Sequence, residues 1–186
     1  MNQTPALHSC QQIADALVQC LRQVRDVVTQ CTAEQYSRKP VGQVQSAVGP
    51  HVRHVLDHAA RWLDSVPDSE INFDARSRGT SDESDPLAAV GRIDGLISRY
   101  SGGQFGHLPG QWTLRMLTHE HSEPVVVPTT PERELLFVFS HTVHHMAIIA
   151  VMARTLGLRL PERFGYAPST PQTAGTAAGV HRHAAG

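Results

Sequence analysis

Apolar residues recur at three- and four-residue steps in four stretches of the chain, a spacing that predicts long helices with one buried face. The expected helices span residues 4–31, 46–66, 85–100 and 130–157. Between the last two, strand-forming residues at 111–117 and 124–127 flank a polar segment, which predicts a short β-hairpin. Four long helices with one small β insertion predict an all-α fold, a four-helix bundle.

The predicted helix ends follow from capping residues and prolines. Asp85-Pro86 and Thr130-Pro131 each place a capping side chain directly before a proline, which favours the start of a helix. Pro50 is tolerated because it falls in the first turn of its helix. The connections, residues 32–45 and the polar segment 68–85, are expected to be loops, the second of them on the surface.

The length of the chain fits one domain. Its 186 residues are enough to bury a real core and too few for two large ones. We expect that domain to cover residues 1–170. Residues 171–186 are mostly Ala, Gly and Thr and lack the apolar content to order themselves, so we expect a disordered tail.

Composition changes the expected partners and compartment. A formal net charge of −1 and a pI near 6.9 give no electrostatic reason to expect nucleic acid or an anionic membrane. Charge or histidine interrupts the apolar segments short of the ~20 residues that a membrane span needs, and the N-terminus is polar. The cytoplasm is therefore the expected location. Cys10, Cys20 and Cys31 all fall in the first expected helix, where buried reduced thiols are the simplest interpretation.

Histidine spacing is the main chemical signal. His141 and His145 are four residues apart in the fourth expected helix, so their imidazoles lie on one face, while His144 is turned away. Two neutral imidazoles placed in this way can bind one transition-metal ion. Such an ion needs at least one more protein ligand.

The second expected helix offers candidates for that ligand. It carries His51, His54 and His58, so two helices hold six of the 12 histidines. All three follow one stripe, and the pattern alone does not choose among them. Neither helix has the Glu-x-x-His spacing of di-iron bundles, so a single ion is expected.

Three segments of the chain together resemble the DinB family of DinB/YfiT-like proteins. They are Gly49-Pro50-His51-Val52-Arg53-His54, His141-Thr142-Val143-His144-His145 and Phe164-Gly165-Tyr166-Ala167-Pro168-Ser169-Thr170. The similarity covers most of residues 6–170. It implies an up-down-down-up four-helix bundle, and it implies that His54, His141 and His145 hold a divalent metal ion, with His51 and His58 as neighbours that could replace or join His54.

The resemblance also implies a class of activity. Three histidines leave positions on the ion open for water or substrate, as in catalytic sites. Several members of the family are thiol-dependent transferases, so we expect a metal-dependent S-transferase or hydrolase in detoxification or stress response, acting on a small molecule with a low-molecular-weight thiol. The metal would be zinc, nickel, iron or copper. The alternative is a non-catalytic metal-binding or dimerising bundle, and a homodimer is compatible with both.

Other polar residues have two interpretations each. Asp57 is either a carboxylate that supports the site or an ordinary surface charge. Arg76, Arg78, Arg133 and Glu134 either bind an anionic substrate or belong to the charged surface. Because histidine ligands must be neutral, metal affinity is expected to fall as the pH drops through about 6.5.

Overall fold

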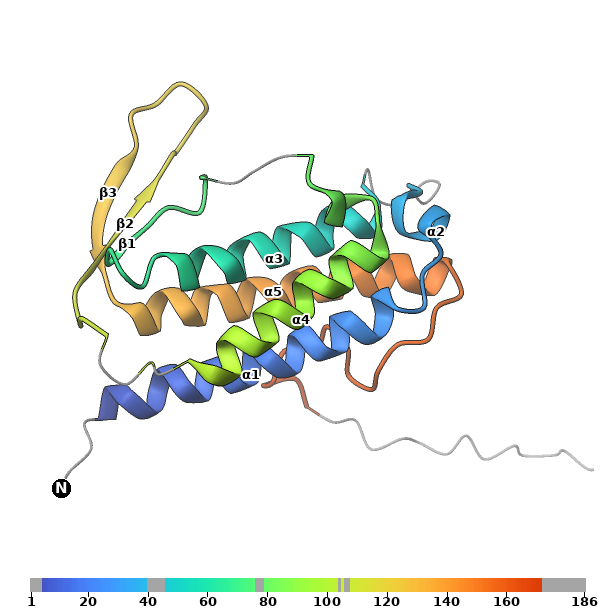
Figure 1. Cartoon of the computed structure of the whole chain (residues 1–186), viewed down its shortest axis with the longest axis horizontal. Helices are drawn as coiled ribbons and strands as arrows, with labels where there is room; N and C mark the ends of the chain where they lie inside the picture. Colours follow the sequence, from blue (N-terminus) through green and yellow to red (C-terminus); the bar gives the residue numbers. More distant parts are fainter. Residues whose placement is uncertain (1–4, 40–45, 76–78, 104, 106–107, 172–186) are drawn as a thin grey trace, which may run out of the picture.

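Most of the described chain is helical (Figure 1). The computed structural model describes residues 5–39, 46–75, 79–103, 105 and 108–171. Its α-helices are α1 (Pro5–Val28), α2 (Ala33–Ser37), α3 (Val48–Asp64), α4 (Pro86–Gly102) and α5 (Pro131–Thr155). The predicted class, mainly helical with a small β insertion, is therefore observed.

Each of the four long helices packs against two of the others. Both α1 and α3 lie against α4 and against α5, as the side-by-side ribbons of Figure 1 show. Each of these helices contributes fully buried side chains to one core, among them Leu21, Leu56, Ile93, Leu135 and Ile149. Burying such a side chain contributes about 1.5–3 kcal/mol. The apolar stripes in the sequence are the inward faces of these helices.

The two best-capped helices begin where their sequences predict. Asp85 accepts a hydrogen bond from the backbone N–H of Leu87 at the start of α4. Thr130 accepts one from the backbone N–H of Arg133 at the start of α5. These bonds satisfy amide groups that the first turn of a helix leaves without partners.

The short helix α2 lies in a segment expected to be a loop. Thr32 and Gln35 form a capping box, each side chain accepting a hydrogen bond from the backbone of the other residue. Tyr36 in this helix is fully buried, and its hydroxyl donates to the backbone carbonyl of Asp82. The capping signal was present in the sequence, and the buried tyrosine fixes the helix in place.

The predicted hairpin is present. Strands β2 (Trp112–Met116) and β3 (Val125–Thr129) pair antiparallel, with Trp112 opposite Thr129. A two-residue strand that was not expected, β1 (Glu70–Ile71), pairs parallel with β2 and completes a sheet of order β1-β2-β3. The hairpin projects from one end of the helices (Figure 1).

The prediction of a surface loop at residues 68–85 is wrong in part. Ile71, Phe73 and Asp82 are buried, and a 3-10 helix, η1 (Ser81–Glu83), packs on α3 and α4. Single apolar residues scattered among polar ones give no periodic signal, so tertiary contacts decide their burial.

Helix α5 is long and apolar enough to cross a membrane by length and composition. The core helix of a folded domain meets the same criteria, and α5 packs on both α1 and α3. Its face toward those helices carries buried Leu135, Ile149 and Met152. Packing in this fold therefore accounts for the buried apolar residues of α5, whereas Leu136 and Val151 on the same helix are exposed.

The segment after α5 folds back on that helix. Phe164 is buried, and Gly165 adopts a φ of 76°, in the left-handed region that favours glycine. A Cβ at Gly165 would lie 2.6 Å from the backbone nitrogen of Ala147, so only glycine allows this approach. The predicted disordered tail begins at Pro171, and its remainder, residues 172–186, lies outside the described residues.

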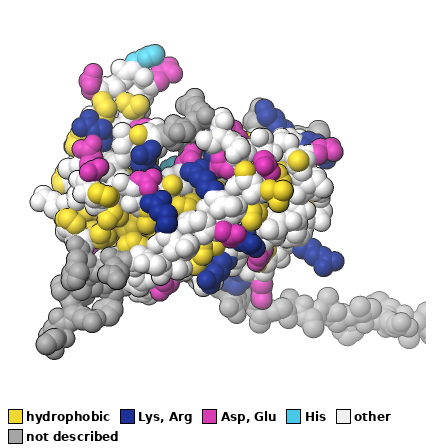
Figure 2. Space-filling view, viewed as in Figure 1, with side chains coloured by type: hydrophobic (Ala, Val, Ile, Leu, Met, Phe, Trp, Pro, Cys, Tyr) yellow, Lys and Arg dark blue, Asp and Glu magenta, His cyan; other side chains and the backbone are white. Residues whose placement is uncertain are grey.

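Charges of both signs are intermingled on the face of the molecule shown in Figure 2. Hydrophobic side chains gather on the same face near the sheet. The exposed apolar residues of the hairpin include Met116, Leu117, Val125, Val126 and Val127.

Candidate metal centre

Histidines from two facing helices converge on one point between α3 and α5. The ring centroid of His54 on α3 lies 5.0 Å from that of His141 and 4.7 Å from that of His145, both on α5. The ring of His58, one turn further along α3, lies 4.4 Å from those of both His54 and His141. The sequence predicted both histidine stripes, and the packing of α3 on α5 brings them together.

Within this cluster, His54, His58 and His141 each offer a ring nitrogen, and these three atoms all lie within 4.8 Å of one another. The Nε2 atoms of His54 and His141 are 2.9 Å apart. Two nitrogens bound to one ion by bonds of roughly 2.0–2.1 Å are about 2.9–3.4 Å apart. The observed separation therefore suits either an N–H···N hydrogen bond or two ligands of one ion.

A backbone hydrogen bond and an aromatic contact orient the ring of His58. Its Nδ1 lies 2.9 Å from the backbone carbonyl of His54, which can only accept a hydrogen bond. Nδ1 of His58 therefore donates to that carbonyl, and whenever the ring is neutral the lone pair is on Nε2. The ring stacks on Phe73, at a centroid distance of 5.1 Å and an interplanar angle of 15°. Orienting contacts of this kind are typical around histidine ligands of metals.

His145 lies beside this group and contacts His51. The Nδ1 atoms of His145 and His51 are 3.0 Å apart, so one of them donates a proton to the other. The ring centroid of His145 is 4.5 Å from that of His141. His144, by contrast, is exposed, as its position on the helix predicted.

Burial favours the neutral forms of His141 and His145. Desolvation, reinforced by the nearby rings of His58 and His144, lowers the pKa of His141 to about 4. Desolvation lowers the pKa of His145 to about 3, with neighbouring histidines led by His141 adding to the effect. The pKa of His51 is also lowered, mainly by desolvation. Neutral imidazoles are the form that binds metal, so this donor set fits a divalent transition-metal ion.

The structure brings together two of the three predicted ligands in the closest group, His54 and His141. The third, His145, contacts both of their rings but lies outside the group of nitrogens within 4.8 Å, and its assignment as a ligand stays a prediction. His58 takes its place in that group. Its four-residue spacing from His54 was a signal for this in the sequence. The contribution of Phe73 was not predictable, because nothing periodic marks a single aromatic residue in a loop.

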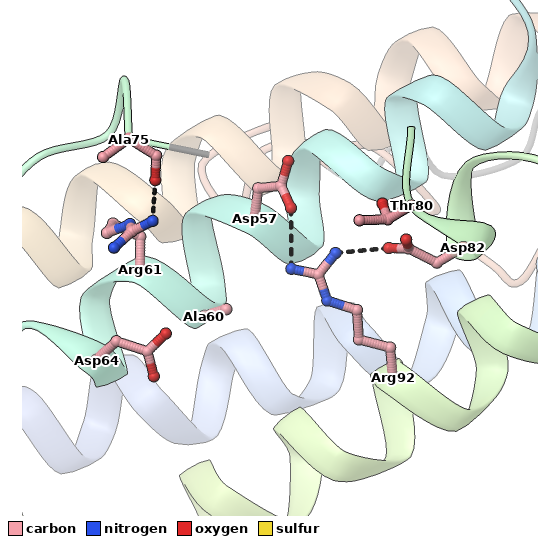
Figure 3. Close-up of a pocket in the computed structure, with 8 residues that line it drawn as sticks. All are labelled: Asp57, Ala60, Arg61, Asp64, Ala75, Thr80, Asp82 and Arg92. Atoms are coloured by element: carbon pink, nitrogen blue, oxygen red, sulfur yellow. Dashed lines mark hydrogen bonds and ion pairs between the residues drawn. The ribbon is translucent and has the colours of Figure 1, made fainter. Parts of the chain in front are cut away.

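Asp57 lines a separate polar cavity beside α3 (Figure 3). One carboxylate oxygen accepts a hydrogen bond from Arg53 at 2.6 Å, and the other accepts one from Arg92 at 2.9 Å. Arg92 also binds Asp82 at 2.5 Å and so joins α4 to η1. Both carboxylate oxygens of Asp57 are therefore engaged in a structural ion-pair network.

Two candidates for substrate binding lie at the start of α5. Glu134 is fully buried, and its Oε1 accepts hydrogen bonds from the Thr129 hydroxyl at 2.6 Å and from Arg133 at 2.8 Å. The Arg133 guanidinium lies 5.8 Å from the ring of Phe137, which stacks on His141. The ring of Phe137 therefore lies near the Arg133 guanidinium and also stacks on a member of the histidine cluster. The other candidates, Arg76 and Arg78, lie outside the described residues.

Comparison with known proteins decides the family. The model of the DinB family matches residues 1–173. The chain belongs to the DinB family. The crystal structure of a DinB-like protein, YjoA, from Bacillus subtilis superimposes with a TM-score of 0.58 over 82% of this chain and 98% of that one. At 14% sequence identity, this likeness shows a DinB-like fold and leaves the activity open.

A second likeness covers only part of the chain. FK506-binding protein 5 of Rhizopus delemar is 31% identical over 103 residues, which are 55% of this chain and 27% of that protein. The match therefore spans about a quarter of the length of the fungal protein.

Proposed function

We propose that this DinB family member is a mononuclear metal-dependent enzyme in which His54, His141 and His145 hold one divalent ion. The observation that carries the proposal is the 2.9 Å approach of the Nε2 atoms of His54 and His141 across two helices. The same proposal includes an up-down-down-up four-helix bundle formed by α1, α3, α4 and α5, whose mutual packing supports it.

The chemistry proposed is thiol S-transfer or hydrolysis. A bound divalent ion would supply a Lewis acid that makes water or a thiol a nucleophile near neutral pH. The chain contributes neutral imidazoles, because burial holds the pKa of His141 near 4. Phe73 and Phe137 contact each other and stack on His58 and His141, so they shield one side of the cluster from water.

The proposed substrates are a small electrophile and a low-molecular-weight thiol. The exposed guanidinium of Arg133 is available at one side of the aromatic contacts, which supports an anionic group on one of the two substrates. Zinc, nickel and iron all suit an imidazole site, so the proposal names no single metal. The proposal also includes action in the cytoplasm and assembly into a homodimer. Light scattering of the purified protein tests the homodimer.

Activity measurements test this function. Protein loaded in turn with zinc, nickel or iron would be mixed with a small thiol and a chromogenic electrophile, and thiol conjugation would be followed by absorbance. The proposal expects metal-dependent turnover that the His141→Ala variant loses and the His144→Ala variant keeps. The enzymatic part would be contradicted if the protein bound one equivalent of metal but turned over none of the tested pairs of thiol and electrophile. That result would favour a non-catalytic metal-binding protein.

A further inference from the structure

We propose that His58 is a fourth imidazole ligand of the ion, so that two facing pairs, His54 with His58 and His141 with His145, surround it. This inference rests on the proposed single-ion site. It changes what that site can do, because a fourth protein ligand occupies a position that an external molecule would otherwise take.

His58 lies close to both His54 and His141. The ligand nitrogen of His58 lies within 4.8 Å of those of both His54 and His141. Its ring centroid is 4.4 Å from each of theirs, whereas the centroids of His54 and His141 are 5.0 Å apart. By ring centroid, His58 is therefore as close to the two predicted ligands as they are to each other.

The backbone hydrogen bond of His58 favours the tautomer that binds metal. The bond from Nδ1 of His58 to the carbonyl of His54 leaves the lone pair on Nε2. A histidine in this tautomer binds a metal without first losing a proton, and the carbonyl increases the basicity of the ring. The tautomer that a ligand needs is thus set before any ion arrives.

The ring of His58 is held in place by its neighbours. His58 is 6% exposed, and its ring stacks on Phe73 from the segment after β1. A ring already held in position loses little rotational freedom when it binds an ion. The contact with Phe73 therefore favours ligation by His58.

The consequence is restricted access to the ion. Zinc in proteins usually takes four ligands, so four imidazoles would fill its coordination shell. A thiol or water would then compete with His58, whereas an ion that accepts five or six ligands would keep open positions. The reaction rate and the choice of metal both depend on this one side chain.

Direct observation of the ligands is the first test. Two-bond proton–nitrogen NMR spectra of ¹⁵N-labelled full-length protein, recorded with and without zinc, report which imidazole nitrogens bind. We expect Nε2 of His58, assigned by its loss in His58→Gln, to shift on zinc binding together with nitrogens of His54 and His141. A His58 signal that zinc leaves unchanged would overturn the proposal. The zinc titration is made on the parent protein, and the variant serves only to assign the signal.

Cobalt binding provides the second test. We expect His58→Gln to weaken the binding of Co²⁺ at least about tenfold and to strengthen the binding of azide to the cobalt-loaded protein, because a coordination position opens. His144→Gln, on an exposed position of α5, is the matched control and should change neither. Equal cobalt and azide affinities in the parent and His58→Gln would overturn the fourth ligand while leaving the single-ion site intact. A parent that binds neither zinc nor cobalt would refute both.

Discussion

His51 illustrates how a residue outside the ligand set can act on it. If His145 binds the ion through Nε2, the proton of its ring must be on Nδ1, which lies 3.0 Å from Nδ1 of His51. His51 then accepts that proton in a hydrogen bond and holds the ring of His145 in the tautomer that binds metal. In that arrangement His51 positions His145 and is not itself a ligand, although its spacing in the sequence made it an equal candidate for one.

Replacing His51 tests this positioning. We expect His51→Leu to raise the zinc dissociation constant about 10–100-fold, because His145 loses the partner of Nδ1. A competition titration against a coloured chelator measures the constant, and His144→Leu is the control. An unchanged constant in His51→Leu would mean that His145 does not depend on His51 for binding.

The lowered pKa values predict how the metal-free protein responds to acid. His141 and His145 have pKa values of about 4 and about 3 when folded, below the unfolded value near 6.5, so the unfolded state binds more protons between these limits. Their contribution to stability is fully present above pH 6.5 and is lost as the pH falls toward 3. Each contributes a slope of at most about 1.4 kcal/mol per pH unit.

Urea unfolding of the metal-free protein at pH 7.5, 5.5 and 4.5 measures this response. We expect the free energy of unfolding to fall with pH, and to fall less steeply in the His141→Asn/His145→Asn double variant. Parallel curves for the parent and the double variant would contradict the lowered values. Burial also moves the expected pH of metal loss below the 6.5 that the sequence alone suggested, because the folded ligands stay neutral.

At the scale of elements, α3 has two polar faces with different tasks. One face carries the histidines toward α5. Another carries Asp57, which pairs with Arg53 and with Arg92 (Figure 3). Arg92 ties α3 and η1 to α4 through two largely buried carboxylates. The network therefore fixes the helix that positions half of the site.

Removing Arg92 tests whether the ion-pair network around it stabilises the fold. We expect Arg92→Leu to lower the free energy of unfolding by about 3 kcal/mol, because two largely buried carboxylates lose their partner. The control Arg99→Leu breaks a half-exposed pair with Asp64 and should cost less than about 1 kcal/mol. Chemical denaturation measures both. A cost for Arg92→Leu no greater than that for Arg99→Leu would show that the network does not support the fold.

The elements that the sequence predicted correctly carry their own local signals. The capped starts at Asp85-Pro86 and Thr130-Pro131 and the β2–β3 hairpin depend on neighbouring residues only. The elements that were missed are short. Strand β1 and η1 form because Ile71 and Asp82 are buried by residues distant in the chain, and a stretch of two or three residues has no period to detect.

At the scale of the whole molecule, the sequence predicts where the site lies more reliably than how it is assembled. The i, i+4 spacing of His141 and His145 and the stripe of His51, His54 and His58 show that two helix faces bring histidines together. Which nitrogens approach one another depends on the rotation of α3 against α5 and on each ring's rotamer, and neither is encoded in spacing. That is why His58 lies in the closest group and His145 beside it.

The central claim is that α3 and α5 together hold one metal ion. Elemental analysis of untagged full-length protein, reconstituted with zinc and then desalted, tests it most directly, with His54→Ala and His141→Ala as the variants and His144→Ala as the control. The account predicts about one equivalent of zinc in the parent and the control, and almost none in the two variants, whose helix content by circular dichroism stays that of the parent. A parent without metal, or variants that keep a full equivalent, would contradict it.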